Sequence, residues 1–318
     1  MRAGVEEIAA FFEAHPEVPG QLGHDAIQCF LDTSRGAEEP LESRCRDLAR
    51  QWFDAAASTA ADDYGELLPF AVSAHELFGN APRTRRLQEA VNDGVGPLDD
   101  MLGYAWRDGD DYELLQWLVC LLDAQATPGL RLPPDVAPFG HAVWRRLLVH
   151  PFVHAADCDA GAMDDAFYDA AYLATHIGYV PTGYGRHRLR ASDHPRLFHY
   201  LRANFDAVLG MGELDLVAEF VDLFRQAGTD VHLVERGTKH LLALHERAGA
   251  WMAHVEAWDD DDPSPYDLVH KAWTGVAGVR NRQTSPRGPY RDAFERWCLT
   301  EAPPGGVVSI CTSGPAEV

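Results

Sequence analysis

Residues 163–188 read MDDAFYDAAYLATHIGYVPTGYGRHR, and their spacing predicts a helix that ends abruptly in a turn rich in proline and glycine. Four polar or aromatic side chains recur at i, i+3, i+7 and i+10, where a core stripe would normally carry leucine or isoleucine: Asp169, Tyr172, His176 and Tyr179. Side chains at this spacing lie along one face of a helix. The stretch therefore predicts a helix with one polar and aromatic face.

The pattern histidine-x-x-aromatic in this helix, His176 with Tyr179, occurs twice more in the chain. One copy is centred on His75, 101 residues upstream, and a clearer copy is centred on His270, 94 residues downstream. The copy at His75 is fainter, because Ala71 replaces the tyrosine that lies four residues before each of the other two histidines. The pattern indicates equivalent histidines on equivalent helices.

A second pair of segments supports a repeat of about 100 residues. Residues 113–125 align with residues 215–227 at an offset of 102, close to the 101 residues that separate the first two histidines. Agreement of separate segments on one offset indicates degenerate repeats. The alternative is coincidence, since amphipathic helices resemble one another.

The rest of the chain predicts an all-α fold. Sustained period-two alternation between hairpin turns is almost absent, so we expect about fourteen helices and less than about 5% strand. Paired helices in sequential repeats favour an α/α toroid or a curved stack of helical pairs.

This pattern predicts that the chain is divided into three parts. We expect an N-terminal helical layer at residues 1–60, a helical-repeat domain in three degenerate units at 61–300, and a loosely ordered tail at 301–318. The N-terminal layer should contain three helices, at about 4–15, 23–33 and 38–59.

The start of the helix that carries His270 has a specific signal. An acidic, proline-bounded run ends at residue 265, where Ser264 is a suitable N-cap and Pro265 suits the first helical position. We therefore expect a new helix to begin there.

Composition and charge bear on the class of partner. The chain of 318 residues is 46% hydrophobic, which suffices for a large core, and its formal net charge is −22. Because phosphate groups are bound by clustered lysine and arginine, this acidity argues against nucleic acid and anionic membranes as partners.

We also expect no secretory signal or membrane-spanning segment in this chain. The N-terminus is acidic and amphipathic, and no apolar run approaches the roughly 18 residues needed to span a bilayer. Six scattered cysteines form no C-x-x-C pair: Cys29, Cys45, Cys120, Cys158, Cys298 and Cys311. We expect reduced thiols and a cytoplasmic location.

Two hypotheses compete for the histidines. In the first, His176 and His270, with His75, converge on a central cavity as ligands of a transition metal such as Zn, Cu or Fe, leaving a position open for substrate. In the second, each histidine is a buried hydrogen-bonding residue that locks one helix pair to the next.

Other polar residues near His176 would line such a cavity. We expect Tyr172, Tyr179 and Asp169 to do so from the same helix, beside His176 and His270 as candidate catalytic groups. Arg186 lies just past the helix, where it could either face a substrate carboxylate or interact with the helix C-terminus.

The segment AYLATHIGYVPTGYG resembles the T-H-x-x-[FY]-x-x-T-x-x-G signature of an uncharacterised, mainly actinobacterial all-helical family often associated with natural-product gene clusters. YDLVHKAWTG and DLVAEFVDLF are similar to later segments of that family, and the resemblance covers about residues 160–280. The residues that fit the signature are Thr175, His176, Tyr179, Thr182 and Gly185. The chain departs from the family at Gly178, Pro181 and Gly183. The resemblance implies an all-helical fold and the importance of His176 and His270, but no particular reaction.

Two functions of different class follow. The first is a tailoring enzyme of specialised metabolism that binds a metal, or a small molecule or peptide as substrate, in a histidine-lined central cavity. The second is a non-catalytic helical-repeat scaffold that binds a partner protein on its concave face.

Overall fold

The computed structural model describes residues 1–59, 64–158, 165–258, 263–280 and 284–300. Within these ranges it contains sixteen α-helices and no strand, and the one β-type contact is an isolated bridge between His187 and Ser285. The prediction of an all-α protein is confirmed. The expected number of helices is slightly low, because short helices of five residues form inside segments rich in proline and glycine, as at Val18–Leu22. The predicted tail and its Cys311 lie outside the described residues.

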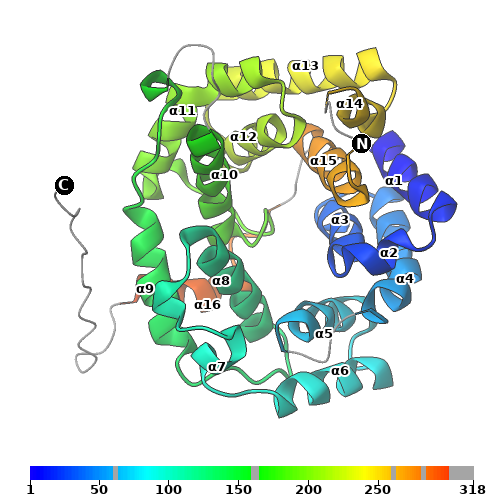
Figure 1. The fold of residues 1–318 in the computed structure, drawn as a ribbon, viewed down its shortest axis with the longest axis vertical. Helices are drawn as coiled ribbons and strands as arrows, with labels where there is room; N and C mark the ends of the chain where they lie inside the picture. Colours follow the sequence, from blue (N-terminus) through cyan, green and yellow to red (C-terminus); the bar gives the residue numbers. More distant parts are fainter. Residues whose placement is uncertain (60–63, 159–164, 259–262, 281–283, 301–318) are drawn as a thin grey trace.

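Six helices contribute side chains to one central cavity. They are α3 (Asp25–Ser34), α5 (Tyr64–Phe78), α8 (Asp111–Ala126), α10 (Asp165–Tyr179), α12 (Leu214–Ala227) and α15 (Pro265–Val279). Each packs on the next from α5 to α15, and α15 packs on α3. An ion pair between Arg35, just past α3, and Glu76 of α5 joins the remaining two neighbours. The helices thus follow one another around the cavity (Figure 1).

The remaining helices cover the outer sides of these six or extend their ends. They are α1 (Arg2–Ala14), α2 (Val18–Leu22), α4 (Leu41–Ala57), α6 (Pro82–Asp93), α7 (Leu98–Leu102), α9 (Val136–Leu148), α11 (Pro195–Met211), α13 (Val231–Ala248), α14 (Trp251–Trp258) and α16 (Pro289–Phe294). Short 3-10 helices lie at Trp106–Asp108, Ala155–Asp157, Val180–Thr182 and Ala191–Asp193, and a π-helical turn at Glu295–Leu299 follows α16. Helix α16 packs on α8, far from it in sequence.

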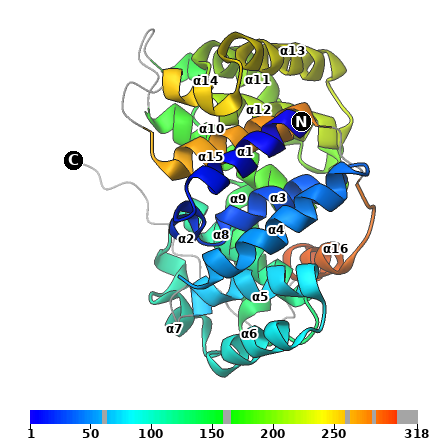
Figure 2. The ribbon, with the colours of Figure 1, turned by 90° about the vertical axis from the view of Figure 1, so that its right-hand side faces the viewer.

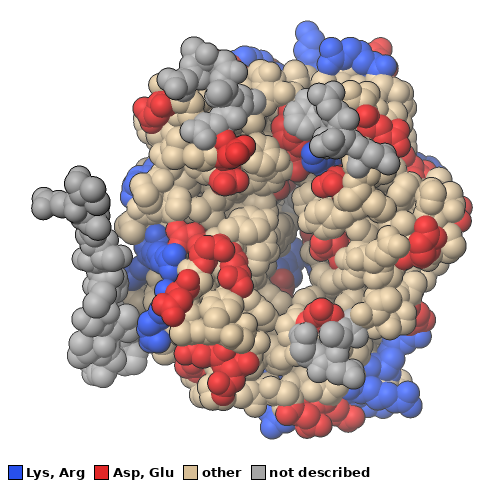
Figure 3. Space-filling view, viewed as in Figure 1, with Lys and Arg blue, Asp and Glu red and all other residues tan. Residues whose placement is uncertain are grey.

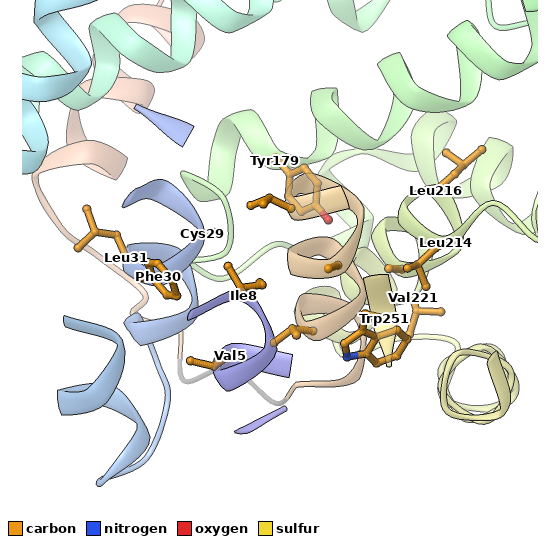
Figure 4. Close-up of a cluster of buried hydrophobic side chains, with 14 of the residues drawn as sticks. Val5, Ile8, Cys29, Phe30, Leu31, Tyr179, Leu214, Leu216, Val221 and Trp251 are labelled. Carbon is orange, nitrogen blue, oxygen red and sulfur yellow. The ribbon is translucent and has the colours of Figure 1, made fainter. Parts of the chain in front are cut away.

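The hydrophobic core joins the beginning of the chain to its later helices. Val5 and Ile8 of α1 share a cluster of buried side chains with Val221 of α12 and with Trp251 (Figure 4). Figure 2 shows α1 lying against α15, and the Glu7 carboxylate accepts the backbone N–H groups of Trp251 and Met252 at 3.1 and 2.6 Å. A second cluster packs α8 and α9 against α5 and α16.

Local signals explain where α15 begins and where α10 ends. Ser264 accepts a hydrogen bond from the backbone N–H of Asp267 at 3.2 Å, the Asp267 carboxylate bonds back to Ser264, and Pro265 is the first helical residue. The predicted start of α15 is therefore confirmed.

Helix α10 ends in a tight turn that is built from the residues after it. Gly183, Tyr184 and Gly185 all have positive φ, at 56°, 55° and 85°. The Thr182 hydroxyl stabilises this turn by donating to the Tyr179 carbonyl at 2.9 Å and accepting the Gly185 N–H at 3.0 Å. The turn brings the Tyr184 ring back onto Tyr179, with ring centroids 5.2 Å apart. Only glycine adopts such angles without strain, which explains the two glycines that flank Tyr184.

No helix in the described part of the chain combines the length and apolar character needed to cross a membrane. The five described cysteines are free thiols, as expected.

Candidate functional site

The central cavity has a volume of about 660 Å³. The space-filling view shows the molecule hollowed near its centre, with acidic side chains on the surrounding face (Figure 3). Three kinds of side chain dominate the cavity wall: the aromatic rings of Tyr112, Trp117, Tyr179, Tyr184, Tyr266 and Trp273, the carboxyl groups of Asp25, Asp32, Glu113, Asp123 and Glu219, and the imidazoles of His24, His176 and His270. A cavity of this size and lining suits a small molecule.

His176 presents an unprotonated nitrogen to this cavity. Its Nδ1 lies 2.9 Å from the carbonyl oxygen of Tyr172, and a carbonyl only accepts, so Nδ1 carries the proton. Nε2 is then the acceptor, 3.4 Å from the Tyr112 hydroxyl. The side chain is 4% exposed, and this burial lowers the pKa of His176 to about 4. The imidazole is neutral at physiological pH and can act as a base.

Glu219 of α12 lies beside His176, and its pKa is shifted in the opposite direction. Its Oε2 accepts the Thr175 hydroxyl at 2.5 Å and lies 3.8 Å from His176 Nδ1. The residue is 5% exposed, and burial raises the pKa of Glu219 to about 8 even though the bond from Thr175 favours the carboxylate. Since both groups are neutral near pH 7, their contact is an acid beside a base and not an ion pair.

Glu219 belongs to a buried acidic stripe on α12. Asp215, Glu219 and Asp222 lie at i, i+4 and i+7 and are all at most 5% exposed. Tyr172 donates its hydroxyl to Asp215, and Tyr179 donates to Asp222 at 3.4 Å. Burial, with a further contribution from the neighbouring Glu219, raises the pKa of Asp215 to about 7. The two tyrosines therefore attach α10 to α12 through this stripe.

His270 lines the same cavity from α15. Its ring stacks on Tyr266, with centroids 5.2 Å apart and planes inclined by 14°, and meets the edge of Trp273 at 5.7 Å. Burial, with a further contribution from His176, lowers the pKa of His270 to about 4. Its Nδ1 is buried and has no hydrogen-bond partner among the described residues.

The third predicted histidine does not reach the cavity. Helix α5 lines the cavity with Gly65, Pro69, Val72 and Ser73, a stripe at i, i+4, i+7 and i+8. His75 is not among the lining residues: it follows Val72 by three positions, about 60° round the helix, at the edge of that stripe. The register inferred from the faint repeat at His75 is therefore incorrect at this helix.

The metal site proposed from the three histidines does not form in the described part of the chain. No group of three or more histidine, cysteine, aspartate or glutamate side chains within it is placed to hold an ion. With His75 outside the cavity wall, only His176 and His270 remain of the predicted ligands, whereas protein zinc sites use three or four. The donor set fits a bound transition metal poorly.

Three further predicted lining residues lie outside the cavity wall: Tyr172, Asp169 and Arg186. Tyr172 bonds to Asp215 instead. Asp169 is exposed and outside the cavity wall, because it lies nearly two turns before His176, toward the outer end of α10. Arg186 also lies outside the wall, with its Nη2 2.5 Å from Oδ1 of Asp123 and its guanidinium 4.6 Å from the Tyr290 ring centroid. Its charge is thus neutralised by the protein itself.

The cavity residues that were not predicted from the sequence include Asp25, Tyr112, Tyr184 and Glu219. Glu219 had a detectable signal, since three acids at i, i+4 and i+7 in DLVAEFVDLF interrupt an otherwise apolar helix face. Asp25 and Tyr112 had none, because each lies in the first turn of an ordinary amphipathic helix.

No family model matches the chain, and neither the curated proteins nor the solved structures contain a significant match to it.

Proposed function

We propose that the protein is an enzyme of specialised metabolism that moves protons on a small molecule held in the central cavity, with His176 as base and Glu219 as acid. The observation that carries this proposal is the pairing of a neutral imidazole, with Nε2 toward the cavity, and a carboxyl group that keeps its proton near neutral pH, 3.8 Å from the same ring.

The two groups support each other during such a reaction. When Nε2 takes a proton from the bound molecule, the imidazolium next to Glu219 favours the carboxylate, because opposite charges attract strongly in a buried site. Glu219 then gives its proton to a second atom of the ligand. The ligand loses one proton and gains another, which describes an isomerisation, or an elimination in which the leaving group is protonated.

We further propose that the fold is an α/α toroid of three units, each with two inner helices: α3 with α5, α8 with α10, and α12 with α15. Two features support this. His176 and His270 line the cavity from the second inner helix of successive units, and the offset of 102 residues matches Trp117 of α8 with Glu219 of α12, both of which line it too.

The scaffold hypothesis receives less support. Its concave face would be the wall of a cavity of about 660 Å³, which accommodates a small molecule more readily than a protein surface. The titratable groups buried there also have no role in a scaffold, whereas perturbed pKa values cluster at active sites.

A deuterium-exchange experiment tests the enzymatic proposal. Purified protein is incubated in D₂O with a metabolite extract of the source organism, and mass spectrometry follows deuterium incorporation and new products. We expect at least one labelled compound, and a loss of labelling of about 100-fold or more in His176→Asn and Glu219→Gln, since positioned acids and bases contribute about 10²–10⁴-fold. The matched controls are His232→Asn and Glu246→Gln, both exposed on α13. Full labelling by either cavity variant would contradict the proposal.

A further inference from the structure

We propose that the cavity holds its ligand through an organic cation, a protonated amine or guanidinium, bound between the Asp25 carboxylate and the rings of Tyr112 and Tyr266. This assignment rests on the proposed function, because it concerns the substrate of the same cavity. Asp25 begins α3, while the two tyrosines lie in the first turns of α8 and α15.

These three residues come from the first turns of three helices that line the cavity. All three line the cavity, and both phenols lie within electrostatic range of the Asp25 carboxylate. Tyr112 and Tyr266 are each 43% exposed, so this part of the wall is open to solvent. Tyr112 is also the residue whose hydroxyl lies 3.4 Å from Nε2 of His176. A ligand held here therefore reaches the base.

The charges of the wall favour a cation. Arg35 is the one basic side chain among the described lining residues, and it is bound to Asp32 and to both oxygens of Glu76. Asp25, by contrast, makes no hydrogen bond or ion pair with any described residue. Burial, with Asp32 nearby, raises the pKa of Asp25 to about 6, which leaves it ionised at neutral pH.

The imidazoles of the cavity do not compensate this charge. Burial lowers the pKa of His24 to about 4, as it does for His176 and His270, so all three rings are neutral. A cationic ligand meets no repulsion from them. An anionic ligand, in contrast, would lie beside an unpaired carboxylate.

A second buried carboxyl group faces the same space. Glu219 is 5% exposed and lines the cavity, and its Oε1 makes no hydrogen bond within the described part of the chain. Because Oε2 accepts the Thr175 hydroxyl, Oε1 is the oxygen that carries the proton of the neutral acid and donates it to the ligand. The site is thus a cavity with two available carboxyl groups and several aromatic rings.

Aromatic faces add to the attraction. A cation near the face of tyrosine or tryptophan is attracted by the negative charge of the ring face, more strongly the more it is desolvated. Helix N-termini by themselves attract anions, and α3, α8 and α15 all begin here. Each, however, already carries acid in its first turn: Asp25, Glu113 and Asp267 respectively.

Binding of matched probes to the full chain tests the inference. Phenethylamine is a cation, 2-phenylethanol its neutral counterpart and 3-phenylpropanoate an anion of similar size. We expect ligand-observed NMR and calorimetry to show that the amine binds about tenfold more tightly than the alcohol, and that the anion binds more weakly still. The inference is overturned if the alcohol or the anion binds as well as the amine, or if no amine binding is detected at millimolar concentration.

Variants locate the cation. Asp25→Asn should weaken amine binding about tenfold and leave alcohol binding unchanged, whereas Glu42→Gln, which removes a first-turn acid from α4 outside the cavity, should change neither. Unchanged amine binding by folded Asp25→Asn would overturn the assignment. Should circular dichroism show that this variant does not fold, Tyr266→Leu at a half-exposed position serves instead, with a severalfold loss expected and no loss counting against the inference.

The outcome is separable from that of the proposed function. His176→Asn should keep the amine preference while it loses deuterium exchange, because the base is not the cation's partner. Preference for the amine with full exchange in His176→Asn would refute the acid–base proposal alone. Loss of exchange without a preference for the amine would refute the cation assignment alone.

Discussion

At the scale of single residues, the site depends on buried groups whose charge is suppressed by their surroundings. His176 and Glu219 are both shielded from water, and this shielding shifts their pKa values in opposite directions, to about 4 and about 8. Each group therefore keeps its neutral form across the same range of pH. The acid and the base are both ready for use without prior proton exchange with solvent.

The activity should consequently have a broad pH optimum. The base is lost when His176 gains a proton below about pH 4, and the acid is lost when Glu219 releases its proton above about pH 8. We expect kcat to be flat from about pH 5 to 7, whereas kcat/KM should fall below about pH 6 as Asp25 gains a proton and no longer attracts the cation; both should fall about tenfold per pH unit well above 8. Rates measured with the compound found by deuterium exchange check this. A rate that keeps rising above pH 8 would show that Glu219 does not act as the acid.

The sequence could predict only those features of the site that depend on the spacing of residues within a single helix. The spacing within α10 and within α15 was enough to place His176 and His270 on inward faces. It was not enough for His75, because the face of α5 that meets the cavity is decided by the helices that cover its other sides. Asp25, Tyr112 and Glu219 come from three helices far apart in the chain, so no local pattern links them.

At the scale of helices, the site depends on how closely α12 and α15 approach. A Cβ atom added at Gly278 of α15 would lie 2.6 Å from Cβ and 2.8 Å from Cα of Ala218 on α12. Contacts this short with backbone cannot be relieved by a side-chain rotation. The absence of a side chain at Gly278 therefore sets the distance between the helices that carry Glu219 and His270.

Replacing this glycine should separate the two helices. We expect Gly278→Ala to lower the free energy of unfolding by about 1–3 kcal/mol through overpacking. Gly210→Ala in α11 is the control, since its Cβ would meet nothing within 4 Å and alanine should stabilise an exposed helical position by about 0.5–1 kcal/mol. Urea denaturation measures both. Equal effects of the two substitutions would mean that the contact at Gly278 does not constrain the packing.

Helix boundaries were the most predictable feature at this scale. Ser264 and Pro265 specify the start of α15 through bonds within four residues. These neighbouring residues are sufficient to determine where the helix begins. The turn after α10 is different. Its glycines were visible, but the placement of Tyr184 against Tyr179 depends on three consecutive residues with positive φ, which a sequence pattern does not specify.

At the scale of the whole molecule, Glu7 joins the N-terminal helix α1 to α14, late in the chain. Its carboxylate accepts the first backbone N–H groups of α14, and α1 also packs on α15. We expect Glu7→Ala to lower the free energy of unfolding by about 1–3 kcal/mol, because two N–H groups lose their acceptor. Glu13→Ala, exposed on the same helix, should change it by less than about 0.5 kcal/mol. Thermal unfolding followed by circular dichroism compares them, and equal melting temperatures would contradict the role of Glu7.

The bond from Glu7 also bears on how the chain is made. Its partners lie 244 and 245 residues later, so α1 leaves the ribosome long before the helices that cover it exist. At roughly 5–20 residues per second, that delay is about 10–50 s. During this time the apolar face of α1, including Val5, Ile8 and Phe12, has only the neighbouring N-terminal helices to pack against. The contacts that cover this face of α1 therefore form only after α14 and α15 have been synthesised.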